Sequence, residues 1–301
     1  HILYNLITKI FYTIFGFSLP ILRLTAFISG VFSIPIIYLI CKKLKQDGRI
    51  AAITFATFPL YIEYSTNARG YTLQIFIFLL ILLLIIENYN LINNYKNNLI
   101  ALFISLATIT IPTFVYLIPG IFIWIFFINY KFQESYKFNS EFLNKLFKLF
   151  FKSILIPILI YTPIIFLSSS LSKTAFGNLT SLNTSDFLNL NIPYIISNLK
   201  FYLANNNKIL IPFFWIIFLI GYLGYIKNKN KIGLFLLPSL ILGIALVFYT
   251  KHSFPAQRTW LILPPIFIII TDSGFSLLLS NLRKALKFLV LFLIFSSLTF
   301  S

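Results

Sequence analysis

The chain has 301 residues, of which 59% are hydrophobic and only 10% are charged, whereas an average soluble domain has about 25% charged residues. This composition excludes an ordinary soluble domain and predicts an all-α, polytopic membrane protein. The net charge of +17 would suit a nucleic-acid partner. In a membrane protein, however, such a charge is typical of basic loops beside anionic lipid, so we expect no nucleic-acid binding.

The first residues, 1–16, form an amphipathic pattern in which Ile2, Leu6, Ile10 and Ile14 share one helical stripe. The segment has the length of a helix that lies on the outer membrane surface rather than one that spans the membrane. The chain contains no methionine, so His1 is not a translation start. We therefore expect an N-terminal segment upstream of His1.

Continuous apolar runs predict about ten helical spans in a single domain, 1–301, and they exclude a membrane β-barrel, whose strands alternate in polarity. One long outer loop, 169–208, interrupts the series. The predicted spans are 24–41, 50–64, 72–87, 99–111, 114–129, 153–168, 209–226, 232–249, 259–271 and 288–301.

The basic residues predict the orientation of these spans. With the start of the chain outside, sixteen of the 24 Lys and Arg residues fall in or beside the inner loops. The bias follows the positive-inside rule through every alternation, which indicates an integral protein of the cell membrane. The outer side then holds only two acids, Glu63 and Asp186.

One short outer connection, Tyr61–Tyr71, concentrates polar groups between two spans: Glu63, Tyr64 and Arg69 lie within it. Charge placed so close to lipid usually faces a protein cavity, a headgroup or water, and a guanidinium is well suited to binding phosphate. Two alternatives stay open. Arg69 could reach the lipid headgroups as an anchor, and the three tyrosines of this connection could form an interfacial aromatic belt.

A second outer connection, between the spans 232–249 and 259–271, carries Lys251, His252 and Arg258. These groups would lie at headgroup level, where they could hold a phosphate or diphosphate. A lone histidine such as His252 is more often a simple polar residue than a metal ligand.

Three segments together resemble the polytopic glycosyltransferases of the GT-C fold. The nearest likeness is to the family of dolichyl-phosphate-mannose–protein mannosyltransferases and bacterial lipid A aminoarabinose transferases. That family has a His-Pro-Pro-Leu-Tyr-like start to a surface helix, a Tyr-Ser-x-x-Ala-Arg-x-Tyr connection and a late arginine that opens a span rich in Leu and Pro. The matching segments here are His1–Tyr4 with Phe15-Gly16, Arg23-Leu24 and Lys42–Leu44, then Tyr64–Tyr71, and finally Arg258–Pro265.

Two positions depart from the family pattern. Ile2 and Leu3 replace the prolines, and Asn67 stands at a position that is often acidic in relatives. Relatives carry their first span and a loop with the catalytic aspartate upstream of the surface helix, and the resemblance implies that both lie before His1. The resemblance therefore implies that the general base lies before His1 and that no catalytic residue is present in this chain.

The resemblance implies transfer of a sugar from a polyprenyl-phosphate donor to an acceptor hydroxyl on the extracytoplasmic side, with inversion. The acceptor stays unidentified, and the fold allows a divalent metal although the sequence shows no ligand cluster. A lipid-linked-glycan flippase or polymerase, or a secondary transporter, is the alternative. The residues expected to bind the donor phosphate are Arg69, Arg258, Lys251 and Tyr71, and those expected to support them are Glu63, Tyr64, His252 and His1.

Overall fold

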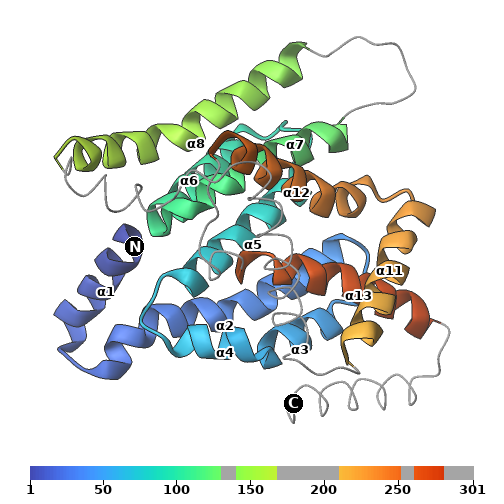
Figure 1. Ribbon diagram of the computed structural model, residues 1–301, viewed down its shortest axis with the longest axis horizontal. Coiled ribbons are helices and arrows are strands. Elements are labelled where there is room, and N and C mark those ends of the chain that lie inside the picture. Colours follow the sequence, from blue (N-terminus) through green and yellow to red (C-terminus); the bar gives the residue numbers. More distant parts are fainter. Residues whose placement is uncertain (130–139, 168–209, 252–260, 281–301) are drawn as a thin grey trace.

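The computed structural model describes residues 1–129, 140–167, 210–251 and 261–280, and within these ranges it contains helices and no strand (Figure 1). The all-α prediction is therefore confirmed for this part of the chain. The elements are α1 (Ile2–Phe15), α2 (Leu19–Lys43), α3 (Arg49–Thr57), α4 (Pro59–Thr66), α5 (Tyr71–Glu87), α6 (Asn94–Thr110), the 3-10 helix η1 (Pro112–Tyr116), α7 (Ile118–Asn129), α8 (Ser140–Leu167), α11 (Leu210–Lys227), α12 (Lys231–Lys251) and α13 (Pro264–Ser280).

Two segments of the described chain are long and apolar enough to cross a membrane, namely α2 and the continuous η1–α7 segment Pro112–Asn129. The bent pair α4–α5 would be a third if it forms one span. The count of ten spans stays a prediction. The predicted loop 169–208 and the predicted span 288–301 lie outside the described residues.

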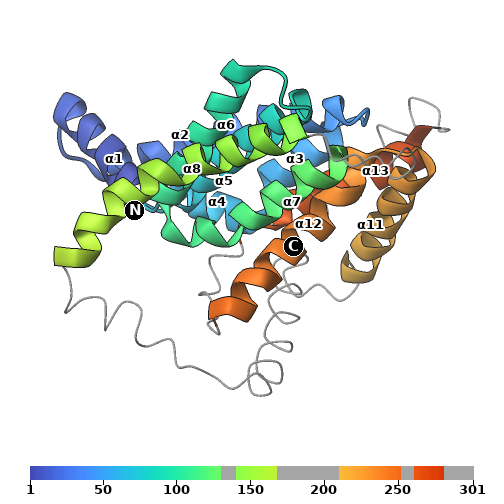
Figure 2. The same cartoon turned by 90° about the horizontal axis from the view of Figure 1, so that it is seen from above.

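The helix α5 forms the centre of the bundle, with α1 at one end of the molecule and α11 at the other (Figures 1 and 2). Its sequence is apolar on every side, and most of its residues are buried, including Phe78, Leu79 and Leu82. A helix that is hydrophobic all round belongs in the core of a large bundle. The helices α2 and α6 pack directly against it.

The run predicted as one span, 50–64, is two helices, α3 and α4. Phe58 is extended, with φ −69° and ψ 116°, and Pro59 opens the next helix. Proline disfavours the helical conformation of the residue before it and cannot donate a backbone hydrogen bond, so a helix usually ends there. By contrast, Pro35 lies inside the continuous helix α2.

Helix ends that the charge pattern assigns to the inner side meet at one end of the bundle. The Glu87 carboxylate at the end of α5 contacts Lys43 Nζ at 2.8 Å and Lys96 Nζ at 2.7 Å. The Asn230 side-chain amide, before α12, donates to the Leu44 carbonyl at 3.3 Å. This arrangement agrees with the predicted alternation of helix directions. We call it the basic end.

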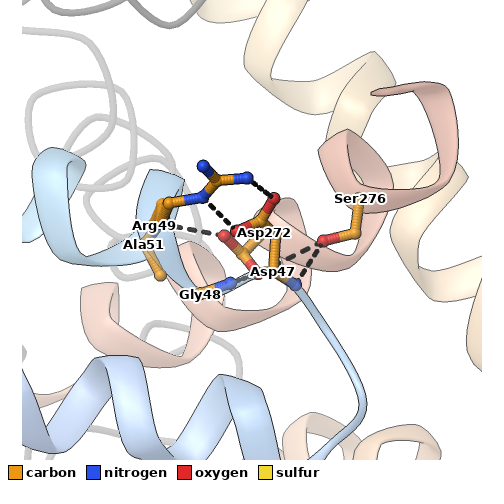
Figure 3. Close-up of polar contacts among 6 residues, drawn as sticks. All are labelled: Asp47, Gly48, Arg49, Ala51, Asp272 and Ser276. Carbon is orange, nitrogen blue, oxygen red and sulfur yellow. Dashed lines mark hydrogen bonds and ion pairs between the residues drawn. The ribbon is translucent and has the colours of Figure 1, made fainter. Parts of the chain in front are cut away.

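A buried carboxylate joins the second half of the chain to the first (Figure 3). Asp272, in α13, accepts hydrogen bonds from the backbone N–H groups of Gly48 at 2.9 Å and Ala51 at 3.0 Å. These N–H groups belong to the first turn of α3, where a helix has no internal acceptors for them. Gly48 adopts a left-handed conformation, φ 78°, and offers no side chain as a cap. Asp272 therefore caps α3 from a helix more than two hundred residues further along the chain.

Neighbouring polar groups complete this contact. The Asp47 N–H donates to the Ser276 hydroxyl at 2.9 Å, and the Asp47 carboxylate pairs with the Arg49 guanidinium at 2.6 Å (Figure 3). The guanidinium lowers the pKa of the Asp47 carboxyl below its usual value by donating hydrogen bonds to the ionised form. A further bond joins this segment to α11: the Gln46 side-chain amide and the Tyr225 hydroxyl form a hydrogen bond.

Glycines allow two helix pairs to approach closely. A Cβ on Gly221 of α11 would lie 2.1 Å from the Ile270 carbonyl oxygen of α13, and a Cβ on Gly243 of α12 would lie 2.3 Å from the Gly120 Cα of α7. Backbone contact of this kind is common between helices in membranes, where small residues increase the van der Waals contact. The packing of the second half of the chain therefore depends on these glycines.

We expect Asp272→Ala to lower thermal stability, because it removes the acceptor of two buried N–H groups. A hydrogen bond to a charged acceptor contributes about 1.5–3 kcal/mol. Asp272→Asn keeps one oxygen acceptor and should lose less. The measurement is thermal unfolding in detergent, with Glu141→Ala as the control, because the side chain of Glu141 is 72% exposed. An alanine variant as stable as the parent would show that Asp272 does not hold α3.

We also expect Gly221→Ala to destabilise the protein by about 1–3 kcal/mol, the usual cost of overpacking. The new Cβ would force α11 and α13 apart. Leu219→Ala is the matched control, because Leu219 lies on the same helix with its side chain 55% exposed. If both variants unfold at the same temperature as the parent, the close approach of these helices is not needed for stability.

Candidate functional site

The predicted Tyr61–Tyr71 connection is a sharp turn between two helices. The axes of α4 and α5 differ by 117°, and residues 67–70 between them are not helical. We call these four residues the elbow. The Arg69 N–H donates to the Asn67 carbonyl at 2.7 Å, and the Thr72 hydroxyl donates to the Tyr64 carbonyl at 2.8 Å. These two bonds fix the turn at both of its sides.

Three predicted site residues come together at the elbow. The His1 ring meets the edge of Tyr71 with 5.5 Å between ring centroids and 73° between ring planes. Tyr64 contacts Tyr71 from the other side at 5.4 Å and 80°. Edge-to-face pairs at such distances are stabilising beyond their buried area. The start of α1, the end of α4 and the start of α5 therefore meet in one aromatic chain, His1–Tyr71–Tyr64.

Arg69 and Glu63, the charged residues of this region, are both exposed. Neither forms a side-chain ion pair with another residue of the described ranges. The Arg69 guanidinium is thus presented to the surroundings at the turn, close in sequence to the first turn of α5. An exposed guanidinium of this kind is favourable for binding an anion.

The aromatic-belt interpretation is wrong for two of the three tyrosines. Tyr71 is only 6% exposed and Tyr61 only 4%, so both are buried in protein and do not face headgroups. Tyr61 stacks on Phe55 with 4.3 Å between ring centroids, and its hydroxyl donates to the Leu261 carbonyl at 3.3 Å. The burial of Tyr71 favours a supporting role over direct contact with a phosphate.

The second predicted cluster consists of Lys251, His252 and Arg258. Lys251 is the last residue of α12, but its side chain lies outside the described part of the chain, as do His252 and Arg258. Their convergence with Arg69 therefore stays a prediction. The segment that follows them is placed, because Leu261 accepts the hydrogen bond from Tyr61.

Sequence reasoning missed two residues that shape this part of the structure. Nothing local in the sequence indicates that Asp272 caps α3. Gly70 was part of the family-like motif, but it packs against His1 and Tyr4 at the start of α1 and against Thr110 of α6, which are distant from it in the sequence. A composition or periodicity signal cannot reveal such contacts.

A metal site is not assigned by the structure. Within the residues whose positions are described, no group of three or more His, Cys, Asp and Glu side chains is arranged to hold a metal ion. Metal dependence therefore stays open.

The geometry can be compared with known proteins. The family model described as dolichyl-phosphate-mannose-protein mannosyltransferase matches residues 2–161, which is more than half of the 301 residues and includes the elbow. Searches of curated proteins and of solved structures gave no significant match. The family agrees with the resemblance seen in the sequence motifs. The chain belongs to the dolichyl-phosphate-mannose-protein mannosyltransferase family and is a membrane glycosyltransferase of the GT-C type.

Proposed function

We propose that the protein transfers a sugar from a polyprenyl-phosphate donor to an acceptor hydroxyl on the extracytoplasmic side of the cell membrane, with inversion at the anomeric carbon. The observation that carries this proposal is the exposed Arg69 at the elbow, inside the segment that matches the family. The contacts of His1, Tyr71 and Tyr64 support the same turn.

The chemistry requires a cation at the leaving group. The acceptor oxygen attacks the anomeric carbon, the bond from that carbon to the phosphate oxygen breaks, and the lipid phosphate leaves with the electron pair. We propose that the hydroxyl proton passes to a general base before His1, a position that the family resemblance supports. Negative charge grows on the phosphate oxygens during this step, and a guanidinium fixed nearby stabilises the transition state.

Arg69 meets this requirement better than the other described cations. It lies in a turn held by two hydrogen bonds, at the end of the bundle opposite the ion pairs of Glu87. Lys251 and Arg258 are proposed as further phosphate ligands on the same side. Glu63 and His252 are supporting candidates, and a membrane-presented lipid donor is the proposed partner.

The exposed side of α1 supports a site at the membrane surface. Leu6, Ile10 and Ile14 of the predicted stripe are 56%, 51% and 66% exposed, so this apolar face is turned away from the protein. The opposite side of α1 is anchored by Tyr4, whose hydroxyl donates to the Leu22 carbonyl at 2.9 Å. An amphipathic helix in this position can lie in the interface where a lipid donor enters.

Helix interruptions are the feature that a secondary transporter would use, because transporters often bind substrate where a helix is interrupted. The predicted span 50–64 is interrupted before Pro59. Pro35, Pro157 and Pro238 instead lie inside the helices α2, α8 and α12. No second function is favoured by a specific observation.

Arg69→Ala should lower kcat with a polyprenyl-phosphate sugar by about 10²–10³, the loss that follows removal of one oxyanion donor. Arg69→Lys should keep part of the activity, because it retains charge but not the planar fork. The assay follows labelled donor consumed by the complete gene product in lipid nanodiscs. Arg49→Ala is the control: Arg49 is an exposed arginine at the basic end. Normal turnover by Arg69→Ala would remove Arg69 from the site.

Cysteine labelling tests the sidedness. Cys41 is the single cysteine and is buried, so Cys41→Ser gives a clean background. Cysteines introduced at Asn67, Lys251 and Arg258 should react with a membrane-impermeant maleimide added outside intact cells. A cysteine at Asp47 should react only after the membrane is opened. Labelling of Asn67 and Arg258 from opposite sides would contradict the proposed site.

A further inference from the structure

Gly70 is buried at the point where three elements meet. A Cβ built on it would lie 2.9 Å from His1 Nδ1, 3.1 Å from Thr110 Cγ2 and 3.3 Å from Tyr4 Cβ. These neighbours come from α1 and from the last residue of α6. A methyl group here would fit only if these neighbours shifted, so the missing side chain lets these elements meet closely at the elbow.

The requirement is for space and not for an unusual backbone conformation. Gly70 has φ −75° and ψ 2°, a conformation that residues other than glycine also adopt. Alanine at this position would therefore cause no backbone strain. Its only effect would be the contact of the new methyl group with its three neighbours.

Of these neighbours, the His1 ring is the one that can move. Tyr4 Cβ is fixed by the backbone of α1, and Thr110 is fully buried, with its hydroxyl bonded to the Leu106 carbonyl at 2.8 Å. His1 is exposed, and its ring is the end of a side chain with two rotatable bonds. A methyl group on residue 70 would thus push the ring away from Tyr71.

We propose that Gly70 is a positioning residue for donor binding: by having no side chain, it lets the His1 ring seat against Tyr71 and so fixes the turn that carries Arg69. This inference rests on the proposed function. Gly70 acts through His1 and Tyr71 and touches no substrate. Successive ring contacts, His1 with Tyr71 and Tyr71 with Tyr64, link the start of α1 to α4.

Gly70→Ala should raise the KM for the polyprenyl-phosphate donor on the order of ten-fold, within the usual coupling range of contacting residues, and should change kcat less. The decisive measurement is a double-mutant cycle with His1→Ala. If Gly70 acts through the His1 ring, Gly70→Ala should have almost no further effect once that ring has been removed. Additive effects would overturn the proposal.

The matched control is Gly120→Ala. A Cβ there would lie 2.7 Å from the Leu240 Cα, so this variant introduces a clash with backbone between α7 and α12, on helices that do not form the elbow. It should lower thermal stability, leave the donor KM unchanged and combine additively with His1→Ala. A structural role alone would make Gly70→Ala behave in the same way, and that result would also overturn the proposal.

Folding of the variant is checked by thermal unfolding in the same nanodiscs. If Gly70→Ala does not accumulate, Gly70→Ala with Thr110→Ser is measured in its place, because serine removes the methyl group at 3.1 Å and keeps the hydroxyl. An unchanged donor KM in that variant contradicts the inference. If the parent consumes no lipid-linked sugar, the proposed function itself fails. If the parent is active, Arg69→Ala is inactive and Gly70→Ala has the same donor KM as the parent, this inference is wrong while the proposed function stands.

Discussion

The structure depends on how buried backbone groups are satisfied where a helix is interrupted. In an apolar surrounding each unpaired N–H group costs several kcal/mol, so an interruption needs a partner from elsewhere in the protein. At the start of α3 that partner is the Asp272 carboxylate, which accepts from Gly48 and Ala51. The interruption between α2 and α3 therefore fixes the position of α13, and α11 packs on α13 through Gly221 and Gly274.

The elbow is held in another way. Two local hydrogen bonds fix its shape, from the Arg69 N–H to the Asn67 carbonyl and from the Thr72 hydroxyl to the Tyr64 carbonyl. The Arg69 guanidinium stays exposed. A turn that is fixed by local bonds is a suitable place to present a charged group to a ligand. This difference explains why one interruption serves stability while the other is proposed to serve binding.

The sequence predicted the helices well because their lengths follow from apolar runs between charged residues. Pattern reasoning failed where the pattern is uniform. The run 50–64 is apolar on both sides of Phe58, so the break before Pro59 gave no change of composition. It also failed for contacts between distant residues, since local periodicity holds no information about Asp272 meeting Gly48. The candidate site was found from a motif, whereas the burial of Tyr61 and Tyr71 became visible only in the fold.

Helix α13 packs against α3, and α13 with the residues just before it is joined to α3 and α4 at two points. The Asp272 carboxylate binds the start of α3, and the Leu261 carbonyl, just before α13, accepts from Tyr61 in α4. The two attachment points, at Leu261 and Asp272, prevent these elements from sliding independently. They form one packing unit. An exchange of segments between family members should therefore transplant α13 together with α3 and α4, because either piece alone would arrive without its counterpart.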